Sequence, residues 1–573
     1  MIYSGFLKAT RSRNHLKASS RQHRSTRKQQ PGSQELYIAY ISAVMTDSTG
    51  AERYSQIQDS KKLYSSPMVR CPTRVQLSDI ARDMGLHLED DELKHFHAEI
   101  EGSIEKINET EDIPEPRLPT KYPRLPGYRP GKEENAYNAW YWKCEIKGAS
   151  DGKLVGKRVA VKDTVAVAGI PMMNGCHALE GFTPDFDATV VTRILDAGGT
   201  IVGKATCEDL CFSGCSSTAA KGPVKNPHDP TRSAAGSSSG SAVVVQTGEA
   251  DMSIGGDQGG SIRLPAAWTG VVGLKPTYGL VPYTGAMGME MSVDHLGPMA
   301  RTVHDCALLL EVIAGYDGGL DARQHPHITV PEYTKEMENA SIEGLKVGLL
   351  SEGFSMKGAD EAVNKLVKET LNKLTAEGAV VKDVSVPLHT KSSNIFMGAI
   401  AEGAYEHVCR LGSCGIGHVG YYPTSFAIAL GKMFSSRVDD LSNSMKVYML
   451  QGEYLQKHYK GQVYCRGRNL VFTLRQAYDK VFETVDVLAM PTIPFTASKL
   501  IFKNDPLSEY FRKCYEMLDN TMAFNLTGHP AISVNAGYLG GLPVGLMIVG
   551  KHYDEVTVFK VAQAVEKIRD EKK

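Results

Sequence analysis

The chain has 573 residues, with 64 lysines and arginines against 65 aspartates and glutamates. Because the charges nearly cancel, the composition gives no sign of a polyanionic partner such as nucleic acid. The 11 cysteines, an odd number, favour free thiols in a reducing compartment over a disulfide framework. No apolar run reaches the roughly 18 residues of a membrane span. We therefore expect an intracellular protein without a nucleic-acid or membrane partner.

The first thirty residues carry eight lysines or arginines and no acid. Such a composition fits a mitochondrial transit peptide, but the stretch lacks a sustained apolar face. A basic tail, or a start of the protein at Met45, is the alternative. Residues 1–65 offer too little apolar surface to offset chain entropy, so we expect an unpacked, disordered extension. We expect the protein in the cytoplasm, and the basic N-terminus leaves mitochondria open.

From Thr73 onwards, apolar residues recur at a spacing of three and four. This spacing predicts a pair of helices, the second beginning after Glu89, closed by Pro114 and Pro116. Residues 66–116 are thus predicted to form a small N-terminal helical segment. A single apolar face needs one surface to bury it, and we expect that surface to be the core. A contact in a homodimer is the alternative.

Residues 117–573 are predicted to form one catalytic domain of the α/β class. Strand-like and helix-like runs alternate along it, which is typical of a largely buried sheet. The runs on which this prediction rests are 188–197, 200–204, 243–246, 270–274 and 346–350.

Two stretches in this domain carry residues suited to proton transfer. Lys162 lies at the end of the alternating β-type run 159–164, where an apolar surround would favour an amine able to accept a proton. Residues 232–242 form a serine-rich loop that leads into the apolar run 243–245 as a helix or strand. Its serines are typical helix caps and turn formers, so the loop alone does not establish chemistry.

The stretch 255–265, Gly-Gly-Asp-Gln-Gly-Gly-Ser-Ile-Arg-Leu-Pro, organises the domain. Its glycines allow a tight turn in which successive N–H groups point into one concavity, as in an oxyanion hole. Ser261 at the edge of such a turn could attack a carbonyl carbon. The expected oxyanion and substrate-binding residues are Gln258, Gly259, Gly260 and Ser261. Gly-Gly-Ser also marks ordinary loops, so the tripeptide alone is ambiguous.

Taken together, these stretches resemble the amidase signature family. The resemblance rests on a Val-Lys-Asp segment, a Gly-Ser-Ser-Ser-Gly loop 75 residues later, and a Gly-Gly-Ser-Ile-Arg turn 24 residues after that. It continues through later blocks and spans roughly residues 135 to 560, the blocks being 273–282, 294–303, 490–492, 524–530 and 541–545. It implies the amidase-signature fold, a large mixed β-sheet core covered by helices on both faces.

The resemblance also implies a Ser-cisSer-Lys catalytic triad. Ser261 would be the nucleophile that forms the acyl-enzyme, Ser237 the bridging serine after a cis peptide bond, and Lys162 the base. A hydroxyl both donates and accepts, so Ser237 can relay a proton from Ser261 to Lys162. This chemistry requires no metal and no cofactor. Ala235 stands where many family members have glycine.

Other candidate residues receive supporting or structural interpretations. Cys207, Cys211 and Cys215 recur every four residues and would stack if this stretch were a helix; without a CxxC pair or a fourth ligand, packing is favoured over metal binding. The position of Cys211 lines the acyl pocket in some family members. Asp257 and Arg263 flank the nucleophile and could pair to hold the turn. We interpret two histidines of the family blocks, His295 and His529, as structural.

The predicted function is hydrolysis of a small-molecule carboxylic amide to the acid and ammonia. The motifs are most similar to those of broad-specificity amidases that accompany nitrile hydratases. One alternative is a glutaminase similar to the A subunit of glutamyl-tRNA amidotransferase, which depends on partner subunits. The other is a catalytically silent scaffold of the same fold, against which the intact Lys162, Ser237 and Ser261 argue.

Overall fold

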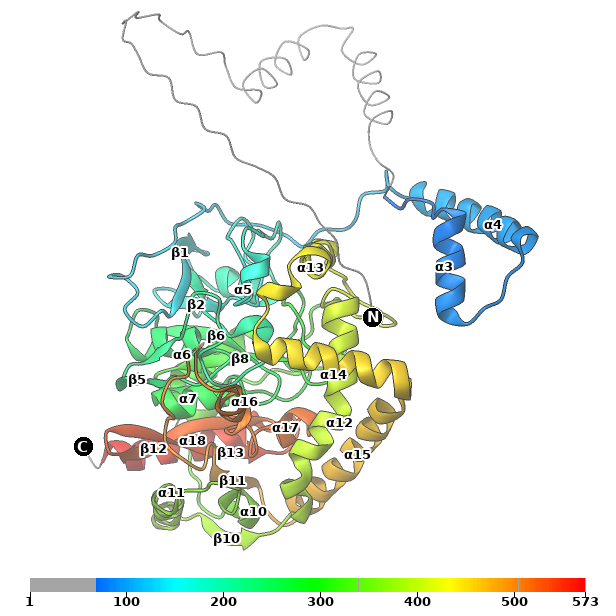
Figure 1. Cartoon of the computed structure of the whole chain (residues 1–573). Helices are drawn as coiled ribbons and strands as arrows, with labels where there is room; N and C mark the ends of the chain where they lie inside the picture. Colours follow the sequence, from blue (N-terminus) through cyan, green and yellow to red (C-terminus); the bar gives the residue numbers. More distant parts are fainter. Residues whose placement is uncertain (1–67, 339, 503, 572–573) are drawn as a thin grey trace, which may run out of the picture. The chain divides into compact units, whose positions relative to one another are not determined.

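The computed structural model (Figure 1) describes residues 68–571, apart from 339 and 503. The basic extension expected at 1–65 lies outside these described residues. The chain divides between Pro116 and Arg117 into two compact units, which are described separately. None of the helices in the described part of the chain combines the length and apolar character that crossing a membrane requires.

The first unit contains the helix pair that the apolar spacing predicts. Helix α3 (Arg74–Met84) begins with a capping box between Thr73 and Gln76, and ends where Gly85 adopts a φ of 78°. Helix α4 (Asp90–Asn108) begins with a second capping box, from Glu89. The two helices pack against each other.

The second unit is built on an 11-stranded sheet, counted over the described residues. In spatial order its strands are β1 (Trp140–Lys147), β3 (Thr200–Ala205), β2 (Arg158–Lys162), β6 (Met252–Asp257), β8 (His295–Ala300), β7 (Val272–Lys275), β12 (Ala531–Leu539), β13 (Leu542–Gly550), β11 (Val487–Pro491), β9 (Lys346–Leu350) and β10 (Val380–Val384). A separate ribbon pairs β4 (Lys225–Asn226) with β5 (Asp229–Ser233).

The sheet is mixed. Strand β2 runs parallel to both β3 and β6, and β9 runs parallel to β10 and β11. The strands between these two groups pair antiparallel, as in β6 with β8 and β12 with β13. Every residue of β6 and β13 is buried. Strands buried on both faces read as continuous apolar or small-residue runs, which is the pattern that the sequence carries here.

Helices flank this sheet (Figure 1). They are α5 (Thr189–Asp196), α6 (Ser239–Gln246), α7 (Arg263–Thr269), α8 (Val303–Ile313), α9 (Tyr333–Met337), α10 (Ser351–Phe354), α11 (Glu361–Lys373), α12 (Ser392–Ala404), α13 (Thr424–Ser436), α14 (Asn443–Tyr459), α15 (Gln462–Phe482), α16 (Leu507–Tyr515), α17 (Met522–Thr527) and α18 (Glu555–Asp570). Helices α6 and α7 pack together and on the sheet, whereas α5, α8, α9, α11 and α18 form a second packed group on it. The fold class predicted from the sequence is confirmed.

The strand order brings the candidate residues to one edge of the sheet. Strand β2 ends at Lys162 and its parallel neighbour β6 ends at Asp257, so the two carboxyl ends lie side by side. The run 243–246, which the sequence leaves open between helix and strand, belongs to helix α6. That helix begins just after Ser237 and Ser238, next to the same strand ends.

Candidate active site

The turn after β6 is fixed from inside by the carboxylate of Asp257. Its Oδ1 accepts a hydrogen bond from the Gly260 N–H at 2.7 Å, and its Oδ2 accepts one from the Ile262 N–H at 3.0 Å. A carboxylate that binds backbone N–H groups three to five residues ahead closes the chain into a tight loop. Gly260 fits this loop with a φ of 140°, and a Cβ there would lie 2.2 Å from Thr521 Oγ1. The turn therefore requires glycine at position 260.

Arg263 forms a fully buried ion pair with Asp257. Its Nη2 lies 3.0 Å from Asp257 Oδ1, and its Nε donates to Oδ2, also at 3.0 Å. Burial alone would raise the pKa of Asp257, but the charge and hydrogen bonds of Arg263, together with Asn525 and Lys275, outweigh burial and hold that pKa well below its ordinary value. The carboxylate thus stays ionised and continues to accept the backbone hydrogen bonds that fix the turn.

Residues far away in the sequence complete this network. Arg263 Nη2 donates to Asn525 Oδ1 at 2.6 Å, and Asn525 Nδ2 donates to Asp257 Oδ1 at 2.8 Å. The Thr521 hydroxyl donates to the Gly259 carbonyl at 2.6 Å, and its own carbonyl accepts from Arg263 Nη1 at 3.0 Å. Helix α17 and the residue before it therefore hold the turn in place.

Lys162 and Ser237 meet in the interior, where both side chains are fully buried. Lys162 Nζ lies 2.8 Å from Ser237 Oγ and 2.9 Å from the Gly256 carbonyl oxygen. The peptide bond between Gly236 and Ser237 is cis, and Ala235 before it has a φ of 56°. Ser237 can accept from or donate to the amine, since its hydroxyl does both.

The acid that follows Lys162 in the sequence has a different partner. Asp163 Oδ1 lies 3.2 Å from Lys204 Nζ in a buried ion pair, and its Oδ2 accepts from the Met173 N–H at 3.0 Å. Burial raises the pKa of Asp163 in spite of that lysine. Within the described residues, Lys162 takes part in no ion pair with a carboxylate.

Ser261 lies beside the serine-rich loop that carries Ser237. Its side chain is buried at 5 % exposure, and its carbonyl accepts from the Ser238 N–H at 3.2 Å. It lines a cavity of about 30 Å³, which has room for one or two water molecules. The other lining residues are mostly apolar: Cys211, Phe212, Ser213, Gln258, Gly259, Met289, Phe396, Tyr448, Tyr515 and Leu518.

The backbone N–H groups of the turn differ in what they bind. That of Gly260 donates to Asp257, whereas those of Gln258, Gly259 and Ser261 have no acceptor within the described part of the chain. Buried N–H groups without a partner are rare in folded proteins. Three such groups in one turn are typical of an anion-binding concavity.

The three cysteines that recur every four residues do not stack on one helix. Leu210 and Cys211 have φ values of 46° and 68°, which break the chain into a short 3₁₀ turn. Cys207 and Cys211 both approach Asn174 Oδ1, at 3.6 and 3.7 Å. Cys215 instead lies 3.7 Å from Cys514. The stretch is not a continuous helix, because two successive residues adopt left-handed φ values.

Cys211 lies close enough to Lys162 and Ser237 for their electrostatic effects to reach it. Burial raises the pKa of its thiol, but the Cys207 thiol, Lys162 and the Ser237 hydroxyl together outweigh burial and bring that pKa to about 6. Cys211 also lines the cavity at Ser261. Only its presence in that cavity, and not its acidity, could be expected from the sequence.

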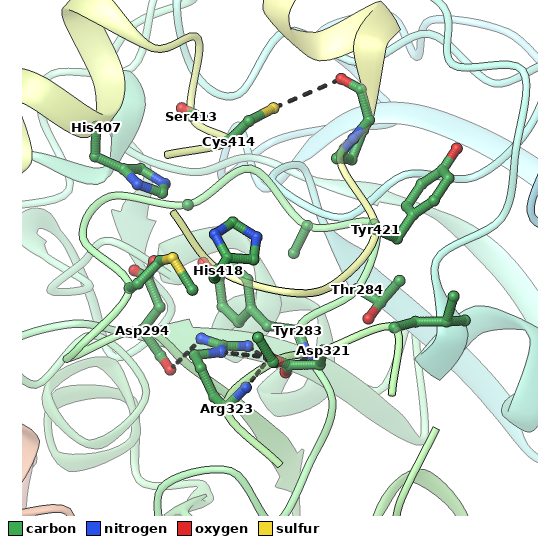
Figure 2. Close-up of a pocket in the computed structure, with 17 residues that line it drawn as sticks. Tyr283, Thr284, Asp294, Asp321, Arg323, His407, Ser413, Cys414, His418 and Tyr421 are labelled. Carbon is green, nitrogen blue, oxygen red and sulfur yellow. Dashed lines mark hydrogen bonds and ion pairs between the residues drawn. The ribbon is translucent and has the colours of Figure 1, made fainter. Parts of the chain in front are cut away.

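A second cavity, of about 60 Å³, lies beside Tyr283 (Figure 2). The Gln258 amide donates to the Tyr283 hydroxyl at 2.9 Å, which links this cavity to the turn. Arg323 forms an ion pair with Asp321 and donates to the Asp294 carbonyl at 3.0 Å. Burial raises the pKa of Asp294 to about 7 even though Arg323 lowers it. Tyr283 is thus a neighbour of the turn that the sequence did not single out.

Comparison with known proteins decides the family. A family model described as Amidase matches residues 132–559. The chain belongs to the amidase signature family. It is an amide-hydrolysing enzyme, in agreement with the sequence prediction.

Two relatives illustrate the activities found among proteins similar to this amidase. It is 40% identical over 495 residues to an enantioselective amidase of Rhodococcus rhodochrous, a match that covers 86% of this chain and 95% of the relative. It is 36% identical over 432 residues to the A subunit of the glutamyl-tRNA(Gln) amidotransferase of Methanosarcina acetivorans, with 75% and 87% coverage.

Two solved structures are also similar to this chain. The A subunit of glutamyl-tRNA(Gln) amidotransferase from Thermotoga maritima superposes with a TM-score of 0.61 at 30% identity, covering 74% of this amidase and 85% of that chain. The peptide amidase of Stenotrophomonas maltophilia gives a TM-score of 0.61 at 29% identity, with 73% and 83% coverage.

Proposed function

We propose that this enzyme hydrolyses a carboxylic amide to the acid and ammonia through an acyl-enzyme on Ser261. The observation that carries the proposal is the buried contact of 2.8 Å between Lys162 Nζ and Ser237 Oγ. Ser237 precedes Ser238, whose N–H binds the Ser261 carbonyl. A base, a relay hydroxyl and a candidate nucleophile thus occupy one buried region, as acyl transfer requires.

In the first half-reaction, Ser261 Oγ attacks the amide carbonyl carbon. Its proton passes to Ser237 while the Ser237 proton passes to the amine of Lys162, which must be unprotonated at that point. The tetrahedral intermediate then collapses, and the C–N bond breaks. The nitrogen leaves as ammonia after it takes the proton back through Ser237.

In the second half-reaction, water replaces ammonia. The water oxygen attacks the ester carbonyl carbon while Ser237 and Lys162 accept a proton from the water. They return this proton to Ser261 Oγ as the acid leaves. Amide and water are consumed, and acid and ammonia are formed, so the enzyme ends as it began. The triad Lys162, Ser237 and Ser261 remains our proposal for the residues that perform both steps.

The negative oxygen of the tetrahedral intermediate needs donors that are already in place. The unpaired N–H groups of Gln258, Gly259 and Ser261 supply them. We assign Gly260 a different part from its neighbours, because its N–H binds the Asp257 carboxylate. Gly260 gives the oxyanion hole its shape, and the N–H groups of the other three residues donate hydrogen bonds to the oxyanion. Removal of one such donor typically costs 10²–10³-fold in kcat.

The lining of the Ser261 cavity supports an apolar acyl group. Phe212, Met289, Phe396 and Leu518 surround it, and Cys211 adds a small side chain to the same wall. At about 30 Å³ the cavity is too small for a phenyl group, so a bulky acyl group requires side-chain movement. We therefore expect small aliphatic amides to react fastest.

A partner-dependent glutaminase is the second candidate. The observation that favours it is the 36% identity to the amidotransferase relative over 87% of that relative's length. Against it, the match to the amidase extends over 495 residues, compared with 432. An enzyme of this kind would release ammonia poorly without its partner subunits.

Ammonia release by the purified chain tests the proposal. The substrates are acetamide, benzamide, a long-chain amide and glutamine, and the variant is Ser261→Ala. Ser239→Ala is a matched control, since Ser239 is a buried serine at the start of α6 whose hydroxyl has no partner among the described residues. We expect activity on acetamide that Ser261→Ala abolishes and Ser239→Ala retains. Activity that survives Ser261→Ala would refute the nucleophile. Silence on all substrates would favour the partner-dependent glutaminase or a silent scaffold.

A further inference from the structure

Asp479, His529 and His552 converge on one point, although they come from three different elements. Asp479 lies on α15, His529 follows α17, and His552 follows β13. One potential ligand atom from each residue lies within 4.8 Å of the other two. His529 Nε2 is 3.1 Å from Asp479 Oδ1, and the two imidazole rings are 4.0 Å apart between centroids.

Thr527 contacts the outer nitrogen of each histidine. Its hydroxyl lies 3.0 Å from the Ala523 carbonyl oxygen and 2.9 Å from His529 Nδ1. When the hydroxyl donates to Ala523, it accepts from His529 Nδ1, and that nitrogen carries the ring proton. His552 Nε2 lies 2.9 Å from the Thr527 carbonyl oxygen, which has no proton to give, so it too carries a proton.

In this arrangement one nitrogen of each neutral ring is unprotonated: Nε2 of His529 and Nδ1 of His552. The first lies 3.1 Å from a carboxylate oxygen of Asp479, a contact that requires either a proton or a positive ion between the two atoms. A proton would satisfy the His529 and Asp479 pair alone, whereas a metal ion would also use His552.

We propose that Asp479, His529 and His552 bind a divalent transition-metal ion of the zinc type. Two imidazole nitrogens and one carboxylate oxygen form a donor set that suits such ions, with water in a fourth position. Metal-to-ligand distances of about 2.0–2.1 Å in a tetrahedral site separate neighbouring donor atoms by roughly 3.3 Å, close to the observed 3.1 Å. The Thr527 groups orient the rings in the way that second-shell partners of zinc histidines do.

The surroundings allow an ion to enter. The Asp479 side chain is 49 % exposed, whereas His529 is fully buried, so the cluster opens to solvent on its carboxylate side. Arg475 Nε lies 3.6 Å from Oδ2 of Asp479, the oxygen that does not face His529. Its positive charge weakens metal binding but orients the carboxylate.

A metal at this place would stabilise the element that holds the catalytic turn. Thr527 is the last residue of α17, and the same helix carries Asn525, which binds Asp257 and Arg263. The ion would tie α15 and the end of β13 to the end of α17. It takes no part in the reaction at Ser261.

Cobalt binding tests the proposal, because tetrahedral Co²⁺ absorbs visible light. The full chain is treated with a chelator and titrated with Co²⁺, followed by displacement with Zn²⁺. The variants are Asp479→Asn, at an exposed position, and His552→Gln. Glu483→Gln is the matched control, since Glu483 is an exposed acid at the C-terminal end of the same helix.

We expect the unmodified chain and Glu483→Gln each to bind one equivalent of Co²⁺. Their Kd should be at least about tenfold lower than that of Asp479→Asn and His552→Gln. Zn²⁺ should also raise the Tm of the unmodified chain and not that of Asp479→Asn. Equal Co²⁺ binding and equal Zn²⁺-dependent Tm in all four proteins would overturn the proposal. So would a ¹⁵N spectrum in which Nε2 of His529 carries a proton in the presence of excess Zn²⁺.

Discussion

Removal of the buried arginine beside the nucleophile should destabilise the enzyme in a pH-dependent way. In Arg263→Gln the Asp257 carboxylate loses its cation but stays fully buried. Breaking a buried pair by removing one partner costs about 3–5 kcal/mol, because an unpaired charge remains inside. Exposed pairs are worth only about 0–1 kcal/mol. Arg437→Gln is the control, since Arg437 pairs with Asp440 at 2.8 Å with both side chains more than a third exposed.

The sign of the pH effect follows from the pKa of Asp257. In the unmodified enzyme Arg263 holds that pKa below its ordinary value, so the stabilisation is present above the ordinary value and is lost only as the pH falls below it. Without Arg263, only Asn525 and Lys275 oppose burial, the largest influence, and we expect the pKa of Asp257 to rise above its ordinary value. The variant is then most stable where the acid is protonated, and it loses stability as the pH rises above the ordinary value for aspartate. The destabilisation should therefore be larger at pH 8 than at pH 5.

The assay is urea unfolding followed by circular dichroism at pH 5 and pH 8, with kcat/KM for ammonia release measured alongside. We expect Arg263→Gln to lose about 3–5 kcal/mol at pH 8 and less at pH 5, together with most of its activity. Arg263→Lys should fall between, because it keeps the charge and loses the bidentate contact. This account of the turn would be refuted if Arg263→Gln lost no more free energy of unfolding than Arg437→Gln, or lost the same amount at pH 5 and pH 8.

Three further predictions concern the site itself. Lys162→Met should lower kcat by about 10²–10⁴-fold while circular dichroism stays unchanged; activity within threefold of the unmodified enzyme would exclude Lys162 as the base. Gly260→Ala should lower the Tm, because its Cβ would lie 2.2 Å from Thr521 Oγ1, whereas in Gly259→Ala the nearest such contact is an ordinary 3.5 Å. Equal Tm values in these two variants would contradict the steric argument. Iodoacetamide should alkylate Cys211 faster as the pH rises through about 6, as peptide mass mapping would show; a rate that rises only above pH 8 would mean that Lys162 and Cys207 do not acidify the thiol.

The sequence predicted those parts of the fold and site that depend on local patterns. Lys162 ends a β-type run, and the glycine-rich stretch around Ser261 forms a turn between a strand and a helix. The mixed sheet followed from the family resemblance, and the family match and solved structures confirm it. Which residues catalyse the reaction stays a prediction.

What the sequence could not supply depends on contacts between distant segments. Asn525 and Thr521 hold the turn from more than 250 residues away, and the sequence showed only that Asn525 lies in a family block. The motif does not reveal that the Gly260 N–H donates to the Asp257 carboxylate, because this contact depends on the folded shape of the turn. From the sequence, His529 is interpreted as structural because the triad requires no histidine. Its two neighbours in the cluster come from other elements, so no spacing along the chain brings the three residues together.

Detection of the acyl-enzyme tests the central claim most directly. The enzyme is mixed with an activated amide or ester of a small acid and quenched in acid, and the intact mass and peptide map are recorded. Our account predicts one acyl group on Ser261, none in Ser261→Ala, and slower accumulation in Lys162→Met. An acyl group on Cys211 or Ser237 in the unmodified enzyme, or turnover without any adduct in the first second, would contradict it.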